Sequence, residues 1–229
     1  MVLASDSRGT FGDPRGVTAQ NDNQKKVYRL SDHSGMLVAG SGEIGMMIYS
    51  ELGKEIDKMQ KAGVTEMMET VRFTLKQKFD EWFPPKKFQL QAMPGVPVPA
   101  RPELVAIIGG YDLVDAKPKT PRIYTLLSTY DFAPMLHDYG FALQGIGQYA
   151  IYLLNRLYRQ DSPIANLIPL AAYVISETAT QDGKVGGPIQ IMTVTNTGSK
   201  ELSLTEVEQV TKENENRREA LRDSFYGRS

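Results

Sequence analysis

The stretch Met1-Val-Leu-Ala-Ser-Asp-Ser-Arg-Gly-Thr10 opens the sequence, and Leu37-Val-Ala-Gly-Ser-Gly42 follows further along. The first is an apolar run leading into Asp6, which is typical of a buried strand that delivers a carboxylate to a turn. The second is an apolar strand that ends in a glycine turn, where backbone N–H groups are exposed before a helix. The basic pair Lys25-Lys26 lies between them. Together these segments predict a carboxylate, an ammonium group and free amides gathered in one place.

The spacing of apolar residues predicts the remaining elements. We expect helices at residues 43–62, from Thr65 to Pro84-Pro85, at 148–158 and from Pro163 to the loop at 181–187, and a charged helical segment from Leu204 onward. Strands are expected at residues 25–30, 35–39, 103–108, 122–127, 135–143 and 189–194. Residues 11–23 are rich in Gly, Pro, Asn and Asp, so we expect a loop there. Helix pairs alternating with strands favour an α+β fold in which helices cover two stacked antiparallel sheets.

Composition excludes several classes of function. The formal net charge is −1 and Lys and Arg are not clustered, so no nucleic-acid or anionic-membrane partner is expected. The chain has no Cys, which removes disulfides, thiolate zinc sites and cysteine nucleophiles. Only His33 and His137 are present, and this argues against a histidine metal site. No apolar run reaches the roughly 18–20 residues that a spanning helix needs. We expect no metal and no cofactor, and a reducing cytoplasm is compatible with this composition.

Several short motifs occur in a recognisable order. They are Ala4-Ser-Asp-Ser-Arg-Gly-Thr10, Lys25-Lys-Val27, Val38-Ala-Gly-Ser-Gly42, Gly109-Gly-Tyr-Asp112, Gly145-Ile-Gly-Gln148, and Asp182 followed by Gly186-Gly187. In this order the chain resembles the proteasome β subunits and the bacterial HslV peptidase, which are N-terminal nucleophile (Ntn) hydrolases. The resemblance covers roughly residues 1–200.

The resemblance implies a four-layer αββα sandwich, with two antiparallel sheets flanked by helix pairs. On this basis we expect one proteasome-like domain at residues 1–200, with a proline-rich insertion at 84–102, and a charged helical C-terminal tail at 201–229. Two readings of the insertion stay open: it is a contact arm to a neighbouring subunit, or it is a solvated loop. The resemblance also implies a homo-oligomeric ring in the cytoplasm, peptide or unfolded-protein substrates and an ATP-dependent unfoldase as a partner.

The family's chemistry uses an N-terminal threonine whose own amine acts as the base, so no histidine is required. By resemblance, Lys26 is the nearby cation that lowers the proton affinity of the nucleophile, and Asp6 keeps that cation in place. Asp182 would orient the amine, and the backbone N–H of Gly40 would be the oxyanion donor. Each residue also has a plain structural reading, as an ion pair, a turn former or a turn glycine. The positions that match the family's pocket walls are Gly9, Gln24, Tyr28, Val38 and Gly42.

Two positions depart from the family's pattern. Ile146 stands where the family usually has Ser between two glycines, and Val185 stands where it usually has Ser or Thr before Gly-Gly. The hydroxyl groups that serve the amine and its water in the family are therefore absent. Three functional readings follow: a threonine-type peptidase whose nucleophile is missing from this chain, a noncatalytic ring subunit or scaffold with the same fold, or an unrelated binding domain that uses the proline-rich segment.

The sequence also leads to an expectation about the gene. Met1 stands inside the first predicted strand, and in the resembled family a strand headed by the nucleophile precedes this point. We expect the reading frame to extend upstream by about one strand's length and to include a Thr, Ser or Cys that becomes N-terminal. Sequencing the DNA upstream of Met1 checks this expectation, and an in-frame stop codon directly before Met1 with no alternative start would contradict it.

Overall fold

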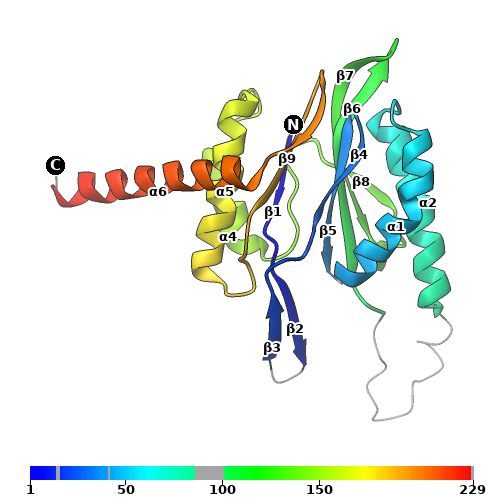
Figure 1. The fold of residues 1–229 in the computed structure, drawn as a ribbon, viewed down its shortest axis with the longest axis horizontal. Helices are drawn as coiled ribbons and strands as arrows, with labels where there is room; N and C mark the ends of the chain where they lie inside the picture. The colour runs from blue at the N-terminus through cyan, green and yellow to red at the C-terminus, as the bar shows by residue number, and fades with distance from the viewer. Residues whose placement is uncertain (14–15, 41, 86–100, 228–229) are drawn as a thin grey trace. The chain divides into compact units, whose positions relative to one another are not determined.

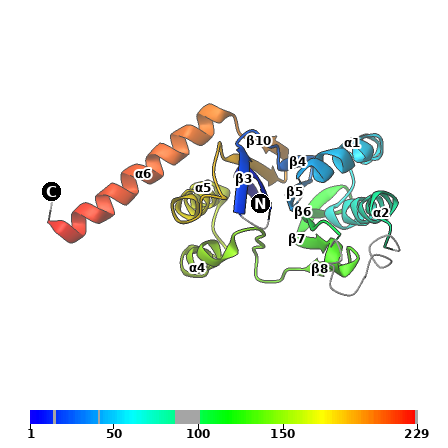
Figure 2. The same ribbon diagram turned by 90° about the horizontal axis from the view of Figure 1, so that it is seen from below.

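The computed structural model describes residues 1–13, 16–40, 42–85 and 101–227. Contacts along the chain divide it into two compact units. The first unit contains residues 1–27 and 145–229, and the second contains residues 28–144. Both units combine antiparallel strands with packed helices (Figures 1 and 2), so the fold class is α+β, as predicted.

The first unit has a three-stranded sheet in the order β1-β9-β10. β1 (Val2–Ser5) pairs antiparallel with β9 (Gln190–Thr195), which also pairs with β10 (Gly198–Glu201). Three helices belong to this unit: α4 (Gly147–Leu157), α5 (Ile164–Gln181) and α6 (Leu204–Tyr226). α5 packs on β1 and lies between α4 and α6. Ala172, Ile191 and Val207 form the buried centre of this unit.

The second unit has a five-stranded sheet in the order β4-β5-β6-β7-β8. The strands are β4 (Val27–Ser31), β5 (Ser34–Gly40), β6 (Leu104–Val114), β7 (Lys117–Leu127) and β8 (Pro134–Leu136), and the short helix η1 (Ser128–Tyr130) follows β7. α1 (Gly42–Lys58) and α2 (Val64–Trp82) pack on each other and on this sheet (Figure 1). Leu30, Ile48, Val71 and Ile108 are among the fully buried residues of its core.

The helices agree with the apolar spacing in the sequence. α1 ends at Lys58, four residues before the predicted end, because the chain then forms a turn in which the Ala62 N–H donates to the Met59 carbonyl oxygen. The charged C-terminal segment is the helix α6, as predicted. Ser203 and Glu206 form a reciprocal capping box at its start, with both side chains bonding backbone N–H groups.

Two predictions about the strands were wrong, and one strand was missed. The loop predicted at residues 11–23 contains residues of two strands, because β2 (Gly9–Asp13) pairs antiparallel with β3 (Gly16–Asn21). Thr10, Phe11 and Val17 are residue types that suit strands. Of the strand predicted at residues 135–143, only Met135 and Leu136 lie in a strand, β8 (Pro134–Leu136). The chain then turns before Gly140, whose φ is 80°. The short strand β10 was not predicted.

β6 extends beyond the predicted end at Gly109-Gly110. Both glycines are paired within the sheet, between β5 and β7. A Cβ atom at Gly110 would lie 2.2 Å from the His33 carbonyl oxygen, so no side chain fits there. These glycines therefore allow the close approach of a neighbouring backbone and do not mark a turn. Most of the proline-rich insertion at residues 84–102 lies outside the described residues.

Candidate active site

Asp6 and Lys26 form an ion pair in the first unit. Asp6 directly follows β1, and Lys26 directly precedes β4. Lys26 Nζ lies 2.7 Å from Asp6 Oδ1 and also donates to the Arg8 carbonyl oxygen at 2.7 Å. The other carboxylate oxygen of Asp6 accepts the backbone N–H groups of Arg8 at 3.2 Å and Gly186 at 3.0 Å. Three donors therefore converge on one carboxylate, one on Oδ1 and two on Oδ2.

The burial of this pair distinguishes it from the neighbouring ion pair. The side chains of Lys26 and Asp6 are 16% and 13% exposed, whereas those of Lys25 and Glu201 are 51% and 48% exposed. An exposed pair contributes about 0–1 kcal/mol to stability. Removing one partner of a buried pair costs about 3–5 kcal/mol, because the remaining charge has lost its counterion. The Asp6–Lys26 pair lies much closer to the buried case.

Asp182 lies in the loop after α5, and this loop is tied to the ion pair. Besides the bond from Gly186 to Asp6, the Ser7 N–H donates to the Gly186 carbonyl oxygen at 3.2 Å. The Asp182 carboxylate accepts the Lys184 N–H at 2.8 Å and thus closes its own turn. The structure brings the Asp182 loop to Asp6, and the role of Asp182 in orienting an amine stays a prediction.

The glycines of this loop lie where side chains have no room. A Cβ atom at Gly186 would lie 2.5 Å from Arg8 Cζ, and one at Gly187 would lie 2.5 Å from Ser7 Oγ. Gly187 also has a φ of 71°, a conformation that side-chain-bearing residues rarely adopt. The Gly-Gly pair therefore permits the close approach of the loop to the turn after β1.

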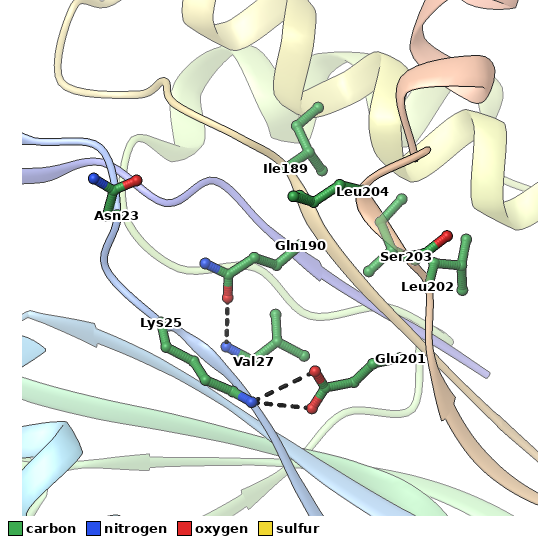
Figure 3. Close-up of a pocket in the computed structure, with 10 residues that line it drawn as sticks. Asn23, Lys25, Val27, Ile189, Gln190, Glu201, Leu202, Ser203 and Leu204 are labelled. Carbon is green, nitrogen blue, oxygen red and sulfur yellow. Dashed lines mark hydrogen bonds and ion pairs between the residues drawn. The ribbon is translucent and has the colours of Figure 1, made fainter. Parts of the chain in front are cut away.

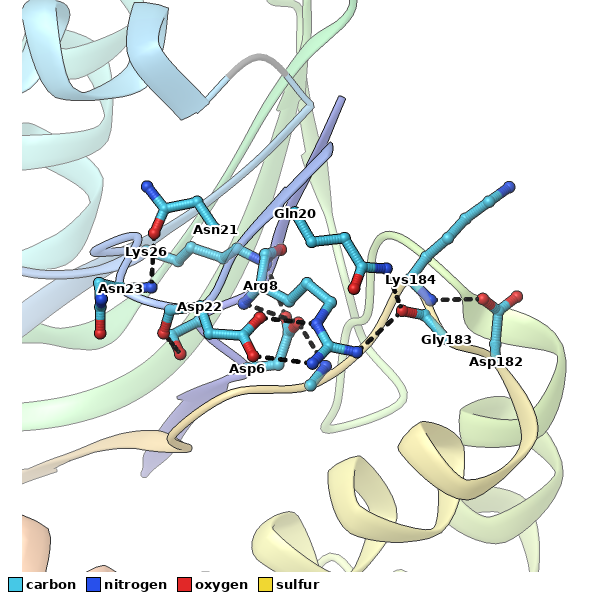
Figure 4. Close-up of polar contacts among 12 residues, drawn as sticks. Asp6, Arg8, Gln20, Asn21, Asp22, Asn23, Lys26, Asp182, Gly183 and Lys184 are labelled. Atoms are coloured by element: carbon cyan, nitrogen blue, oxygen red, sulfur yellow. Dashed lines mark hydrogen bonds and ion pairs between the residues drawn. The ribbon is translucent and has the colours of Figure 1, made fainter. Parts of the chain in front are cut away.

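Arg8 and Asp22 are site residues that the sequence reasoning missed. The guanidinium of Arg8 bonds both carboxylate oxygens of Asp22, at 2.6 Å and 2.8 Å, and donates to the Gly183 carbonyl oxygen at 2.9 Å (Figure 4). Gln20 Nε2 donates to the same carbonyl at 2.9 Å. The hydrogen bond with Asp22 raises the pKa of Arg8, and the bond from Arg8 lowers the pKa of Asp22. Arg8 thus connects the β2–β3 hairpin with the Asp182 loop.

The predicted pocket residues fall in both units. In the first unit, a Cβ atom at Gly9 would lie 2.5 Å from Gln24 Oε1, so these two positions are adjacent. In the second unit, Tyr28 and Val38 are buried in the core, and Tyr28 packs against Tyr49. Burial raises the pKa of Tyr28 to about 12. The assignment of these residues to a substrate pocket stays a prediction.

The glycine turn after β5 belongs to the second unit. Gly40 ends β5 with a φ of 92°, and a Cβ atom there would lie 2.3 Å from the Glu103 carbonyl oxygen. Gly42 is the first residue of α1. The glycine at position 40 is therefore required by the backbone, and its role as an oxyanion donor stays a prediction.

The two departures from the family's pattern lie in the first unit, one just before α4 and the other in the loop after α5. Ile146 is the residue before α4, and Val185 donates its backbone N–H to the Asp182 carbonyl oxygen at 3.1 Å. Among the described residues, no three His, Asp or Glu side chains are placed to share a metal ion. No helix in the described ranges is long and apolar enough to span a membrane.

The sequence of the chain was compared with those of known proteins. No model of a known protein family matches the chain. Proteasome subunit beta 1 of Thermococcus kodakarensis is 25% identical over 209 residues, which cover 90% of this chain and 89% of that protein. Proteasome subunit beta 2 of Thermomonospora curvata is 28% identical over 221 residues, which cover 92% of this chain and 71% of that protein. The chain is similar to proteasome β subunits. It spans only 59% of another relative, the Proteasome subunit beta of Gordonia bronchialis, to which it is 26% identical.

Solved structures show the same fold. Anbu from Hyphomicrobium sp. strain MC1 matches with a TM-score of 0.68 at 16% identity, covering 98% of this chain and 92% of that protein. Its Gly-1 mutant matches with a TM-score of 0.66 at 17% identity, covering 98% of this chain and 91% of the mutant. These likenesses confirm the predicted fold class.

The contact between Arg8 and Asp22 leads to a prediction about pH. In Arg8→Gln the pKa of Asp22 should rise toward its ordinary value, because the guanidinium no longer bonds the carboxylate. In the parent protein the folded-state pKa of Asp22 lies below its unfolded value of about 4, so its contribution to stability is present above about pH 4 and is lost as the pH falls below that. The parent should therefore be more stable than the variant at neutral pH, and this difference should shrink in acid.

Urea unfolding at neutral and acidic pH, together with an NMR titration of Asp22, measures these effects. Arg29→Gln is the matched control, because Arg29 pairs with Asp32 at an exposed site. An unchanged pKa of Asp22 in Arg8→Gln would contradict the assigned contact.

Proposed function

We propose that this chain is a proteasome β-subunit-like, threonine-type peptidase that degrades peptides or unfolded proteins within a ring assembly. The observation that carries this proposal is the desolvated Asp6–Lys26 pair, to which the Gly186-Gly187 loop is bonded. The similarity to proteasome β subunits over most of the chain supports it. The likeness to HslV, drawn from the sequence motifs, belongs to the same proposal.

The proposed chemistry follows from the charges at the pair. An ammonium group close to a hydroxyl nucleophile lowers the pKa of that hydroxyl, because it stabilises the developing alkoxide. Lys26 would supply this charge, and Asp6 would hold it in place. By the resemblance to the family, the Gly40 N–H would stabilise the oxyanion, and Gly9, Gln24, Tyr28, Val38 and Gly42 would form pocket walls. Asp182 would orient the amine of the nucleophile.

We propose that a nucleophile would enter at the Asp6 end of β1. Neighbouring antiparallel strands joined by a tight turn run in opposite directions. A strand that preceded Val2 and turned back along β1 would therefore begin near Ser5 and Asp6, beside the Lys26 ammonium. Met1 itself lies at the other end of β1, roughly 16 Å from Asp6 at about 3.3 Å per residue. Burial lowers the pKa of the Met1 amine to about 6, and this amine donates to the Val194 carbonyl oxygen. It is thus too far from Lys26 to serve as the base of this site.

A second candidate function is a noncatalytic ring subunit or scaffold. Ile146 and Val185 favour it, because neither side chain can donate or accept a hydrogen bond where the family usually has a hydroxyl. Fold and assembly would then be retained without hydrolysis. For either function we propose a cytoplasmic location, which fits the absence of Cys, and an ATP-dependent unfoldase as a partner.

Peptidase activity separates the two functions. The chain that begins at Met1 should be inactive, because loss of a nucleophile costs on the order of a millionfold in rate. The protein extended to its upstream nucleophile should hydrolyse fluorogenic peptides, and Lys26→Ala should abolish this activity. Lys25→Ala is the matched control and should leave the rate unchanged, since Lys25 pairs with Glu201 at an exposed site. If the extended protein is inactive, or if it is active and Lys26→Ala has no effect, the peptidase assignment is wrong.

The ring assembly has its own test. Closed cyclic symmetry satisfies repeated contacts between identical subunits, so a ring-forming chain should have a mass that is a fixed multiple of 25.5 kDa. Mass photometry of the full-length product at micromolar concentration should show one large species. A monomer under these conditions would contradict ring formation.

A further inference from the structure

Gln190 connects β9 with the segment around Lys26 in the first unit. It is the first residue of β9 and pairs with Ser5, the residue before Asp6. Its Oε1 atom accepts the backbone N–H groups of Lys26 at 3.0 Å and Val27 at 3.2 Å. Its Nε2 atom donates to the Gln24 carbonyl oxygen at 2.7 Å. One amide side chain therefore bonds three backbone groups around Lys26, and Figure 3 shows its bond to Val27.

The segment that Gln190 contacts has no regular structure of its own. Residues 24–26 lie between β3 and β4 and belong to no strand or helix. Their backbone N–H and C=O groups have no sheet ladder, so they need other partners. The chain passes from the first unit to the second between Val27 and Tyr28. Lys26 thus stands at the end of an irregular segment, just before the chain leaves the unit that contains Asp6.

The side chains of the neighbouring residues Lys25 and Lys26 bond different carboxylates. The Lys25 ammonium bonds the Glu201 carboxylate at 3.1 Å and 3.4 Å, across a pocket of about 380 Å³ that Gln190 also lines (Figure 3). Lys26 Nζ bonds Asp6 (Figure 4). A small rotation of the backbone at residues 24–27 would move Lys26 Nζ away from Asp6. The position of this backbone therefore sets whether Lys26 Nζ reaches Asp6.

We propose that Gln190 is a positioning residue, which holds the Lys26 backbone on β9 so that the Lys26 ammonium stays on Asp6. The consequence for catalysis rests on the proposed peptidase function, whereas the positioning itself does not. Asp6, just after β1, holds the end of the Lys26 side chain, and Gln190, at the start of the neighbouring strand β9, holds its backbone.

The chemistry of the amide explains why Gln suits this position. Its oxygen accepts two N–H groups while its nitrogen donates to a carbonyl, and no charged side chain does both. Glu would keep the two accepted bonds but could not donate to Gln24. Leu has a similar length and makes none of the three bonds. Gln190→Glu and Gln190→Leu therefore separate the two bonds near Lys26 from the single bond to Gln24.

Amide hydrogen exchange in the protein of residues 1–229 tests the positioning without any activity. In Gln190→Leu the Lys26 N–H should exchange about tenfold faster or more, because it has lost its acceptor. The 15N signal of the Lys26 ammonium should also broaden as it leaves Asp6. Gln190→Glu should preserve both signals. The control Glu201→Ala, which removes only the exposed pair with Lys25, should leave them unchanged. Exchange of the β9 amides, followed in the same spectra, shows whether the sheet remains folded.

An unchanged Lys26 exchange rate and ammonium signal in a folded Gln190→Leu protein would overturn the proposal. If Gln190→Leu does not fold, Gln190→Ser is used in its place and read in the same way. In the upstream-extended protein, Gln190→Leu should lower kcat at least tenfold with little change in KM, and Gln190→Glu should restore most of it. If Lys26→Ala abolishes activity while Gln190→Leu leaves kcat unchanged, the proposed positioning role of Gln190 is wrong and the peptidase function stands. If the extended protein is inactive but the exchange data agree, only the peptidase function fails.

Discussion

The arrangement of the first unit depends on a partly desolvated ion pair between Asp6 and Lys26. A charge removed from water is stable only when its counterion and its remaining hydrogen-bonding positions are all matched. Here the match requires three separate parts of the chain: the turn after β1, the segment before β4 and the loop after α5. The antiparallel pairing of β1 with β9 brings the first and third of these parts together.

Close backbone approach is the second condition for this cluster. The loop carrying Gly186 and Gly187 reaches Asp6 only because neither residue has a side chain, and Gly9 makes room for Gln24 in the same way. The second unit uses the same device at Gly40 and Gly110, where a backbone carbonyl occupies the position of a Cβ atom. At such a position glycine is needed because a neighbouring backbone lies too close for a side chain. Gly110 therefore lies inside a strand and does not mark a turn.

The irregular segments around the ion pair are ordered by bonds from side chains to backbone groups. Arg8 and Gln20 both donate to the Gly183 carbonyl, and Gln190 bonds the segment at residues 24–27. Such bonds replace the ladder that a strand would provide. The outer contact between Arg8 and Asp22 is charged, whereas Gln190 is neutral and bonds only backbone groups of this segment.

The helices and most strands were predictable from the sequence, because apolar residues recur with the period of each element. The motif order also brought out Asp6, Lys26 and Asp182, and the structure joins the first two directly. The β2–β3 hairpin and the full length of β6 were not predicted. Gly and Pro occur in turns, in bulges and where two backbones approach closely, and the sequence alone does not distinguish these cases.

Arg8, Asp22 and Gln190 were missed for another reason. Lys26 and Gln190, which bond each other, are 164 positions apart in the sequence. A bond between a side chain and a distant backbone group leaves no periodic signal in either segment. The sequence by itself determined the helices, most strands and the charged pair of Asp6 and Lys26. Only the tertiary structure decided which other residues hold this pair, because those partners lie far apart in the sequence and are brought together by the pairing of β1 with β9.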